Sequence, residues 1–314
     1  MSPISYRASL KNPEVEEPVD LLVHRPLGYL VARAAYPTPI TADALTILSM
    51  LIGVSAGALF YLSVITGTDY AAVACALFTL SAIVDCSDGQ LARMRKSSSR
   101  HGRMLDGAVD GVVQIAVLPA MVVHMIWRRG GIHAPGSWWW LAGTIVAIVT
   151  GLRHTTLYDT FKNIYARNTD SDPKDCDDLD DFMAQYREAA AAGPLGFRRR
   201  FLFEFYRFHL QTTAQTIRWI DPFIPSRFRD MPPYSPQRAA EFRRANRGLM
   251  RAWSFFGIGT HIFIVAACVT FARLEYYVLI RAIGFNVVLL FLVPLQRRAS
   301  RVFFGANDAK LSAP

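Results

Sequence analysis

The chain has 314 residues, of which 52% are hydrophobic and 19% charged, and its formal net charge is +9. This balance is typical of a polytopic membrane protein that also carries soluble sequence. The basic residues are scattered around the ends of apolar runs without a nucleic-acid-binding motif, so we expect anionic lipids or nucleotide ligands, and no nucleic acid, as their partners. The four cysteines are isolated, and nothing in their spacing indicates a disulfide framework or a zinc site.

The N-terminal region, residues 1–41, is polar at first and then amphipathic. Residues 1–17 lack an early apolar run and predict a disordered segment without a cleavable signal peptide. Residues 18–36 mix Leu and Val with Arg25 and Arg33, and they are too short and polar to cross a bilayer. They predict a helix in the membrane interface, either a plain anchor or a lid beside an active site.

Six apolar runs are each long enough to cross a bilayer, which takes about 20 residues. They cover about 43–66, 70–93, 104–127, 137–158, 252–272 and 275–296. The predicted fold class is all-α: a polytopic membrane protein with six transmembrane helices, an N-terminal interfacial helix and a cytoplasmic helical insertion. The predicted parts are 1–41, then 42–158 with the first four spans, then the insertion 159–251, and finally 252–314 with the last two spans and the C-terminal tail.

Basic residues predict the orientation of these spans. Four lie in the loop 94–103 and three follow the last span, whereas the opposite loops carry none at 67–69 and only Arg128 and Arg129 near residue 130. By the positive-inside rule, both termini and the loop 94–103 face the cytoplasm. We therefore expect an integral membrane protein, in the inner membrane if the source is bacterial.

Four aspartates at the ends of the second and third predicted spans form the most specific motif. It reads D-x2-D-G-x2-A-R-x8-G-x3-D-x3-D, and its fixed positions are Asp85, Asp88, Gly89, Ala92, Arg93, Gly102, Asp106 and Asp110. The spacings i, i+3 and i, i+4 put each Asp pair on one helix face. Ionisable groups at membrane depth usually mark a functional site, and four clustered carboxylates need a counter-charge. An all-oxygen ligand set favours Mg²⁺ or Mn²⁺.

This motif resembles the signature of the CDP-alcohol phosphotransferase (CDP-alcohol phosphatidyltransferase) family at every fixed position. The resemblance implies an integral membrane enzyme that transfers a substituted phosphate from a CDP-linked donor to an alcohol and releases CMP. It also implies that Asp85, Asp88 and Asp106 ligate two metal ions, and that Asp110 acts as general base and can approach the metal. Residues lining the nucleotide and diphosphate would be Asp85, Asp88, Gly89, Ala92, Arg93 and Gly102. A homodimer is expected from the resemblance alone.

One departure from the family pattern precedes the first span. Many relatives carry T-P-N-x-x-T there, whereas this chain has Asp43 in the position of the Asn, between Thr41 and Thr46. A role of that Asn is in doubt here, and Asp43 is a candidate cap of the first helix.

The donor and acceptor are open at this point. CDP-diacylglycerol with a small polar alcohol is favoured, and a CDP-linked small alcohol with a lipid or phosphorylated polyol acceptor is the alternative. Arg153 and His154 are weak candidates for binding an anionic acceptor, with ordinary interfacial residues as the competing interpretation. A cation transporter using intramembrane carboxylates is a remote alternative that leaves Gly89, Arg93 and Gly102 unexplained, and a non-enzymatic scaffold leaves the metal-ligand pattern unexplained.

The insertion 159–251 contains an acidic stretch, a basic aromatic stretch from Phe197 to Trp219, and proline-rich sequence from Pro222 to Pro236. The basic aromatic stretch predicts either a segment lying along the membrane or over the active site, or a self-packed cytoplasmic helical hairpin.

Overall fold

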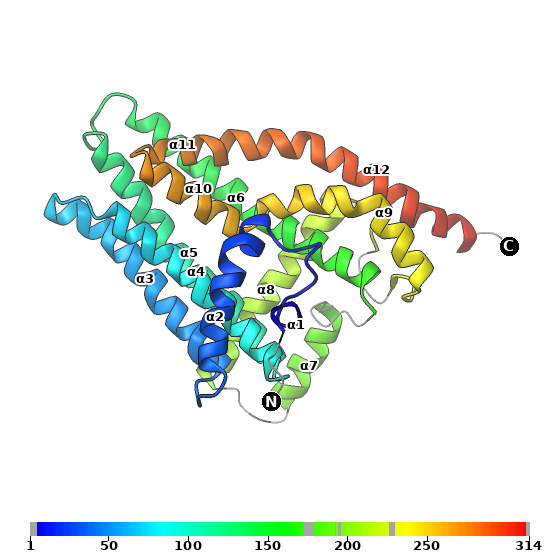
Figure 1. Cartoon of the computed structure of the whole chain (residues 1–314). Coiled ribbons are helices and arrows are strands. Elements are labelled where there is room, and N and C mark those ends of the chain that lie inside the picture. The colour runs from blue at the N-terminus through cyan, green and yellow to red at the C-terminus, as the bar shows by residue number, and fades with distance from the viewer. Residues whose placement is uncertain (1–4, 172–178, 192, 194–195, 226–229, 312–314) are drawn as a thin grey trace. The chain divides into compact units, whose positions relative to one another are not determined.

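The computed structural model describes residues 5–171, 179–191, 193, 196–225 and 230–311, and every regular element within these ranges is a helix (Figure 1). This confirms the predicted all-α class. The elements are α1 (Tyr6–Ser9), η1 (Asp20–His24), α2 (Arg25–Ala35), α3 (Ala42–Thr66), α4 (Ala71–Met94), α5 (Arg100–Arg128), α6 (Ser137–Thr169), α7 (Leu179–Ala191), α8 (Phe197–Ile220), α9 (Pro236–Trp253), η3 (Ser254–Phe256), α10 (Ile258–Thr270), α11 (Leu274–Leu279), η4 (Ile280–Gly284) and α12 (Phe285–Leu311). Part of the predicted insertion, including most of its acidic stretch, lies outside the described residues.

Four helical stretches of the described chain are long and apolar enough to cross a membrane. They are Ala42–Thr66, Ala71–Met94, Arg100–Arg128 and Leu274–Phe304, and a fifth crossing results if Pro236–Phe256 and Ile258–Thr270, bent by 50°, form one span. The predicted run 137–158 lies inside α6, but α6 is not among the helices apolar enough to cross a membrane. Three tryptophans, Arg153 and His154 lower its mean hydropathy. The structure supports four or five spans, and the count of six stays a prediction.

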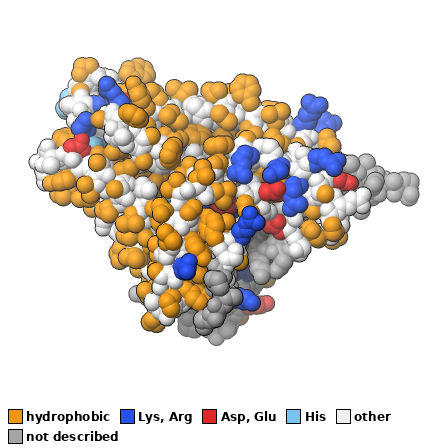
Figure 2. Space-filling view, viewed as in Figure 1, with side chains coloured by type: hydrophobic (Ala, Val, Ile, Leu, Met, Phe, Trp, Pro, Cys, Tyr) orange, Lys and Arg blue, Asp and Glu red, His pale blue; other side chains and the backbone are white. Residues whose placement is uncertain are grey.

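The candidate spans expose apolar side chains, as expected for helices that face lipid. Along α3, Leu51, Tyr61 and Ile65 are more than half exposed. Figure 2 shows hydrophobic side chains over much of this helix, whereas Lys and Arg gather over α9. Exposed aliphatic surface of this extent requires an apolar environment, which agrees with an integral membrane protein.

The chain forms two compact units. The first consists of Met1–Gly151 and Ile258–Ile283, and the second of Leu152–Gly257 and Gly284–Pro314. The division into four parts predicted above stays a prediction.

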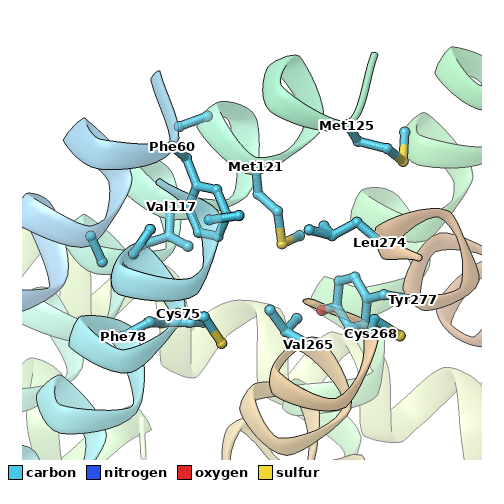
Figure 3. Close-up of a cluster of buried hydrophobic side chains, with 14 of the residues drawn as sticks. Phe60, Cys75, Phe78, Val117, Met121, Met125, Val265, Cys268, Leu274 and Tyr277 are labelled. Atoms are coloured by element: carbon cyan, nitrogen blue, oxygen red, sulfur yellow. The ribbon is translucent and has the colours of Figure 1, made fainter. Parts of the chain in front are cut away.

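Helices α3, α4 and α5 pack closely in the first unit because small residues line their contacts. A Cβ added at Gly53 would lie 2.7 Å from Val113 Cγ1, and one at Gly57 would overlap the backbone of Ala116. Figure 3 shows the apolar core that these helices share with α10 and α11, in which Phe60, Met121 and Tyr277 are buried. On α5 these close contacts begin about one turn beyond Asp110.

Local capping sets the helix boundaries around those acidic residues. Thr41 caps α3 by accepting a hydrogen bond from Ala44 N, and Ser99 caps α5 by accepting one from Gly102 N. The expectation that Asp43 caps the first helix is therefore wrong, because the hydroxyl two residues earlier fills that place.

The described N-terminal residues 5–17 pack against other parts of the first unit, so the prediction of disorder is wrong for these residues. Glu17 is buried and accepts hydrogen bonds from the backbone nitrogens of Gly259 and Thr260 at 3.2 and 2.7 Å. Arg25 donates to Glu16 at 3.0 Å, and α2 packs on α4 through Gly28. The sequence pattern did not indicate the contacts of Glu17, because its partners lie more than 200 residues away in the chain.

The second unit is held together by aromatic contacts. Phe161 of α6 stacks on Trp253 of α9 with ring centroids 4.4 Å apart, and Trp253 Nε1 donates to Gln296 of α12 at 3.0 Å. Phe182 of α7 packs against Phe203 of α8 at 5.5 Å. Most of the predicted insertion therefore folds as part of this unit.

Candidate active site

Helices α4 and α5 bring three of the predicted carboxylates together. One ligand oxygen from each of Asp85, Asp88 and Asp106 lies within 4.8 Å of the other two. Asp88 is buried, and the other two are partly buried. Carboxylates at such distances repel one another strongly in a poorly solvated site unless a cation or protons neutralise them. These three residues could therefore hold a divalent metal ion.

The loop 95–99 determines this convergence. It reverses the chain between α4 and α5, and Arg95 fixes it by donating to the carbonyl oxygens of Ala35, Thr38 and Ile40 at 2.8, 2.7 and 2.5 Å. The α5 cap at Ser99 then places Asp106 about two turns into its helix, level with Asp85 and Asp88 on α4. Arg95 thus has a structural role within the basic loop.

Asp110 lies one turn beyond Asp106 on α5. Its carboxylate is close enough to Asp85 to interact with it electrostatically, but it does not belong to the group of three that share a ligand position. The arrangement separates three candidate ligands from a fourth carboxylate nearby.

Two hydroxyl residues of α3 contact the cluster, and sequence reasoning assigned neither to the site. Thr46 Oγ1 donates to Asp88 Oδ2, and Ser49 Oγ donates to Asp85 Oδ1 at 3.4 Å. Thr46, Ser49 and Gly53 follow one another at helical spacing in a predominantly apolar span. This row of hydroxyl and small residues could have predicted that the same face of α3 lies against the site, because such side chains in a membrane helix usually face the bundle interior.

Arg93 is held over Gly89. Arg93 Nε donates to the carbonyl oxygen of Ser9 at 2.6 Å, and a Cβ added at Gly89 would lie 3.2 Å from Arg93 Nη1. Gln90 connects the same helix to the N-terminal region, donating to Arg25 O at 3.1 Å and to Ser9 Oγ at 3.3 Å. The N-terminal segment thus sets the position of the guanidinium group predicted to meet a phosphate.

The small residues of the motif lie at the same end of the helices. Ala92 is in the last turn of α4, and its carbonyl accepts from Ser97 N at 2.8 Å. Gly102 is in the first turn of α5, where an added Cβ would lie 3.3 Å from Ser99 Oγ and 3.8 Å from Asp43 Oδ1. Asp43 therefore faces the start of α5.

The two candidate acceptor residues lie on α6 in the second unit. Arg153 is exposed and donates to Thr216 Oγ1 at 3.0 Å. His154 is fully buried, with its ring against Phe256 and Phe285 and its Nε2 atom 3.3 Å from Asn286 Oδ1. Both residues thus have hydrogen-bond partners within the second unit, and such contacts agree with a structural role.

The family model of the CDP-alcohol phosphatidyltransferases matches residues 39–170. This range begins just before α3 and ends with α6, so it contains every residue predicted for the metal, nucleotide and acceptor sites. The N-terminal segment and helices α7 to α12 lie outside it. No curated protein matches the chain.

Proposed function

We propose, because the family model of the CDP-alcohol phosphatidyltransferases matches residues 39–170, that the protein transfers a phosphatidyl group from CDP-diacylglycerol to a small alcohol and releases CMP in phospholipid synthesis. The family as a whole transfers such a group from a CDP-linked donor to an alcohol. The observation that carries the proposal is the convergence of Asp85, Asp88 and Asp106 within 4.8 Å inside the matched range. A cation transporter would not need the rest of the motif.

The proposed metal site uses Asp85, Asp88 and Asp106, with Asp110 able to approach it. An all-carboxylate donor set fits Mg²⁺ or Mn²⁺ and would be unusual for Zn²⁺. Two ions are proposed, as in the family pattern. Bound there, they would neutralise the diphosphate and stabilise the departing CMP.

The residues of the chain supply the other parts of the reaction. We assign Asp110 as the general base, which takes the proton of the acceptor hydroxyl. The hydroxyl oxygen then bonds to the phosphorus of the phosphatidyl group, the bond from that phosphorus to the CMP oxygen breaks, and CMP leaves with the bonding electrons. Arg93 would bind the diphosphate, while Gly89, Ala92 and Gly102 leave room for the nucleotide.

The acceptor site is proposed at Arg153 and His154. Exposed Arg153 suits direct contact with an anionic acceptor, while buried His154 suits a supporting position. An acceptor without a negative charge would remove the reason for this assignment.

A CMP-release assay on the purified protein tests the function. CDP-diacylglycerol and CDP-linked small alcohols serve as donors, each with a panel of polar alcohols, phosphorylated polyols and diacylglycerol. We expect CMP release with CDP-diacylglycerol and one class of polar acceptor. Release only from a CDP-linked small alcohol would reverse the donor assignment, and no release with any pair would contradict the family function.

The proposed topology has six spans with the Asp cluster and both termini on the cytoplasmic side. In a background without the native cysteines, Ser98→Cys and Ser235→Cys should label from the cytoplasmic face only, and His133→Cys from the opposite face. Labelling of residues 98 and 235 from opposite sides would make the number of crossings between them odd. The proposed homodimer is tested separately by mass measurement in lipid nanodiscs.

A further inference from the structure

Helix α8 carries a row of exposed aromatic side chains outside the family-matched range. Phe197, Phe201, Phe208 and Trp219 are between 53% and 88% exposed. At about 100° per residue, these four positions fall within about 40° of one another around the helix axis, along about 33 Å of its length. Four large aromatic groups in one line give this side of the helix apolar patches that water solvates poorly, with exposed Gln215 between Phe208 and Trp219.

The opposite side of α8 is packed inside its unit. Leu202 and Phe203 are buried, and Phe203 contacts Phe182 and Tyr186 of α7 with ring centroids 5.5 and 5.0 Å apart. The exposed row, which we call the aromatic stripe, is therefore separate from the face that holds α8 to α7.

Positive charge flanks the aromatic stripe on one side. Arg200, Arg207 and Arg218 fall within about 20° of one another around the axis. Glu204, near the edge of the stripe, is neutralised by an ion pair with Arg207 at 2.6 Å and accepts a hydrogen bond from Tyr186 at 2.9 Å. Arg200 and Arg218 remain exposed. Aromatic groups on one face with arginines beside them suit an anionic lipid surface.

The C-terminal end of α8 is held beside the end of a candidate membrane span. Arg297 of α12 donates to the carbonyl oxygens of Ile220 and of Trp219, the latter at 3.1 Å. Arg297 is the first basic residue after the apolar run of α12, within the candidate span Leu274–Phe304. Basic residues in this position lie at the level of the lipid headgroups, so Trp219 is held at the same level.

From these contacts we propose that α8 lies in the headgroup region of the bilayer, with its aromatic stripe among the lipids and its arginine flank against anionic headgroups. The partner is thus an anionic lipid surface, and the helix anchors the second unit to it. This role does not depend on the transfer reaction proposed above.

Photocrosslinking in the full-length protein tests the proposal. The photoreactive residue p-benzoylphenylalanine replaces Phe208 in the stripe, Phe203 on the buried face, or exposed Ala184 on α7. Each protein is placed in nanodiscs of phosphatidylcholine with or without phosphatidylglycerol, irradiated and analysed by mass spectrometry. We expect lipid adducts at position 208, adducts within the chain at 203, and few adducts at 184. Adducts to a second protein chain at 208, or no more lipid there than at 184, would overturn it.

The contribution of charge is measured in the same experiment. In nanodiscs with both lipids, phosphatidylglycerol should be enriched among the adducts at position 208, and the combined change Arg200→Gln, Arg207→Gln and Arg218→Gln should lower that enrichment about threefold or more. An unchanged enrichment would contradict the arginine role.

Tryptophan fluorescence, which requires one substitution at most, tests the location of the stripe independently. Lipids brominated near the headgroup should quench the fluorescence of Trp219. The quenching at this residue is measured as the difference between the wild-type protein and Trp219→Phe. Absence of this difference would contradict the location of the stripe.

Discussion

The aspartate cluster and the buried Glu17, both in the first unit, differ in what surrounds their carboxyl groups. Asp85, Asp88 and Asp106 face one another, whereas Glu17 accepts hydrogen bonds from two backbone nitrogens and the Thr260 hydroxyl. An acidic group whose oxygens are satisfied by protein donors can serve the fold, while carboxylates gathered around one point favour a cation. Burial of an acidic residue therefore does not distinguish a structural role from metal binding. The groups that its carboxyl oxygens face distinguish them.

Metal removal gives the largest expected contrast between the two groups. Chelation of divalent ions should abolish CMP release, and added Mg²⁺ or Mn²⁺ should restore it, because the aspartate cluster, in contrast to Glu17, has a donor set that suits a metal ion. The thermal stability contributed by Glu17 should not change. Full turnover in chelated buffer would contradict the assignment of the cluster.

Replacing a single cluster residue should come close to that effect. Asp85→Asn, Asp88→Asn and Asp106→Asn should each lower CMP release about a thousandfold and weaken both metal and CDP binding, because each removes one charged ligand. Glu17→Gln is the matched control, a buried carboxylate changed to its amide outside the cluster, and it should retain turnover within about threefold. Equal losses in the control would show that burial alone explains the sensitivity.

Asp110→Asn should separate rate from binding. We expect a loss in CMP release of about a hundredfold or more, with CDP affinity much less affected, because a general base acts mainly in the transition state. Titration calorimetry with CDP, alongside the rate assay, measures both. If this variant loses CDP binding as severely as Asp88→Asn, Asp110 is mainly a metal ligand.

Thr46→Val should produce a smaller change, of about tenfold, in the metal concentration needed for half-maximal CMP release. The change removes the hydroxyl that donates to Asp88, and such supporting hydrogen bonds tune metal affinity. Thr46→Ser keeps the hydroxyl and should behave like the wild type. An unaltered metal requirement in Thr46→Val would show that the contact does not support the site.

Glu17 should make stability depend weakly on pH. Burial, together with the charge of the neighbouring Asp20, raises the pKa of Glu17 from 4.5 to about 8 in the folded protein. The hydrogen bonds from Thr260 and Gly259 lower this pKa, but their effect is smaller than that of burial. The folded state thus binds this proton more tightly than the unfolded state, and its contribution to stability is lost as the pH rises from about 4.5 to 8. The melting temperature in detergent should be a few degrees lower at pH 8.5 than at pH 6, and Glu17→Gln should reduce this difference. An identical pH dependence in the variant would assign it to other groups.

Local sequence patterns were sufficient for the helical class, for four of the span positions and for the three residues that converge as candidate metal ligands. Hydropathy periods and the i, i+3 spacing of Asp85 and Asp88 depend only on helix geometry, and a short loop between two helices forces the return of Asp106. The span at 137–158, the orientation and the roles of Asp110, Arg153 and His154 stay predictions.

Long-range contacts decided what those patterns could not. Nothing local to Ser9 indicates that its carbonyl holds Arg93, or local to Glu17 that it caps α10, because each partner lies far away in the chain. Thr46 and Ser49 point at the cluster only because α3 packs on α4 at Gly53 and Ser81. Helix periodicity assigns a side chain to a face, but only tertiary packing determines which group that face meets.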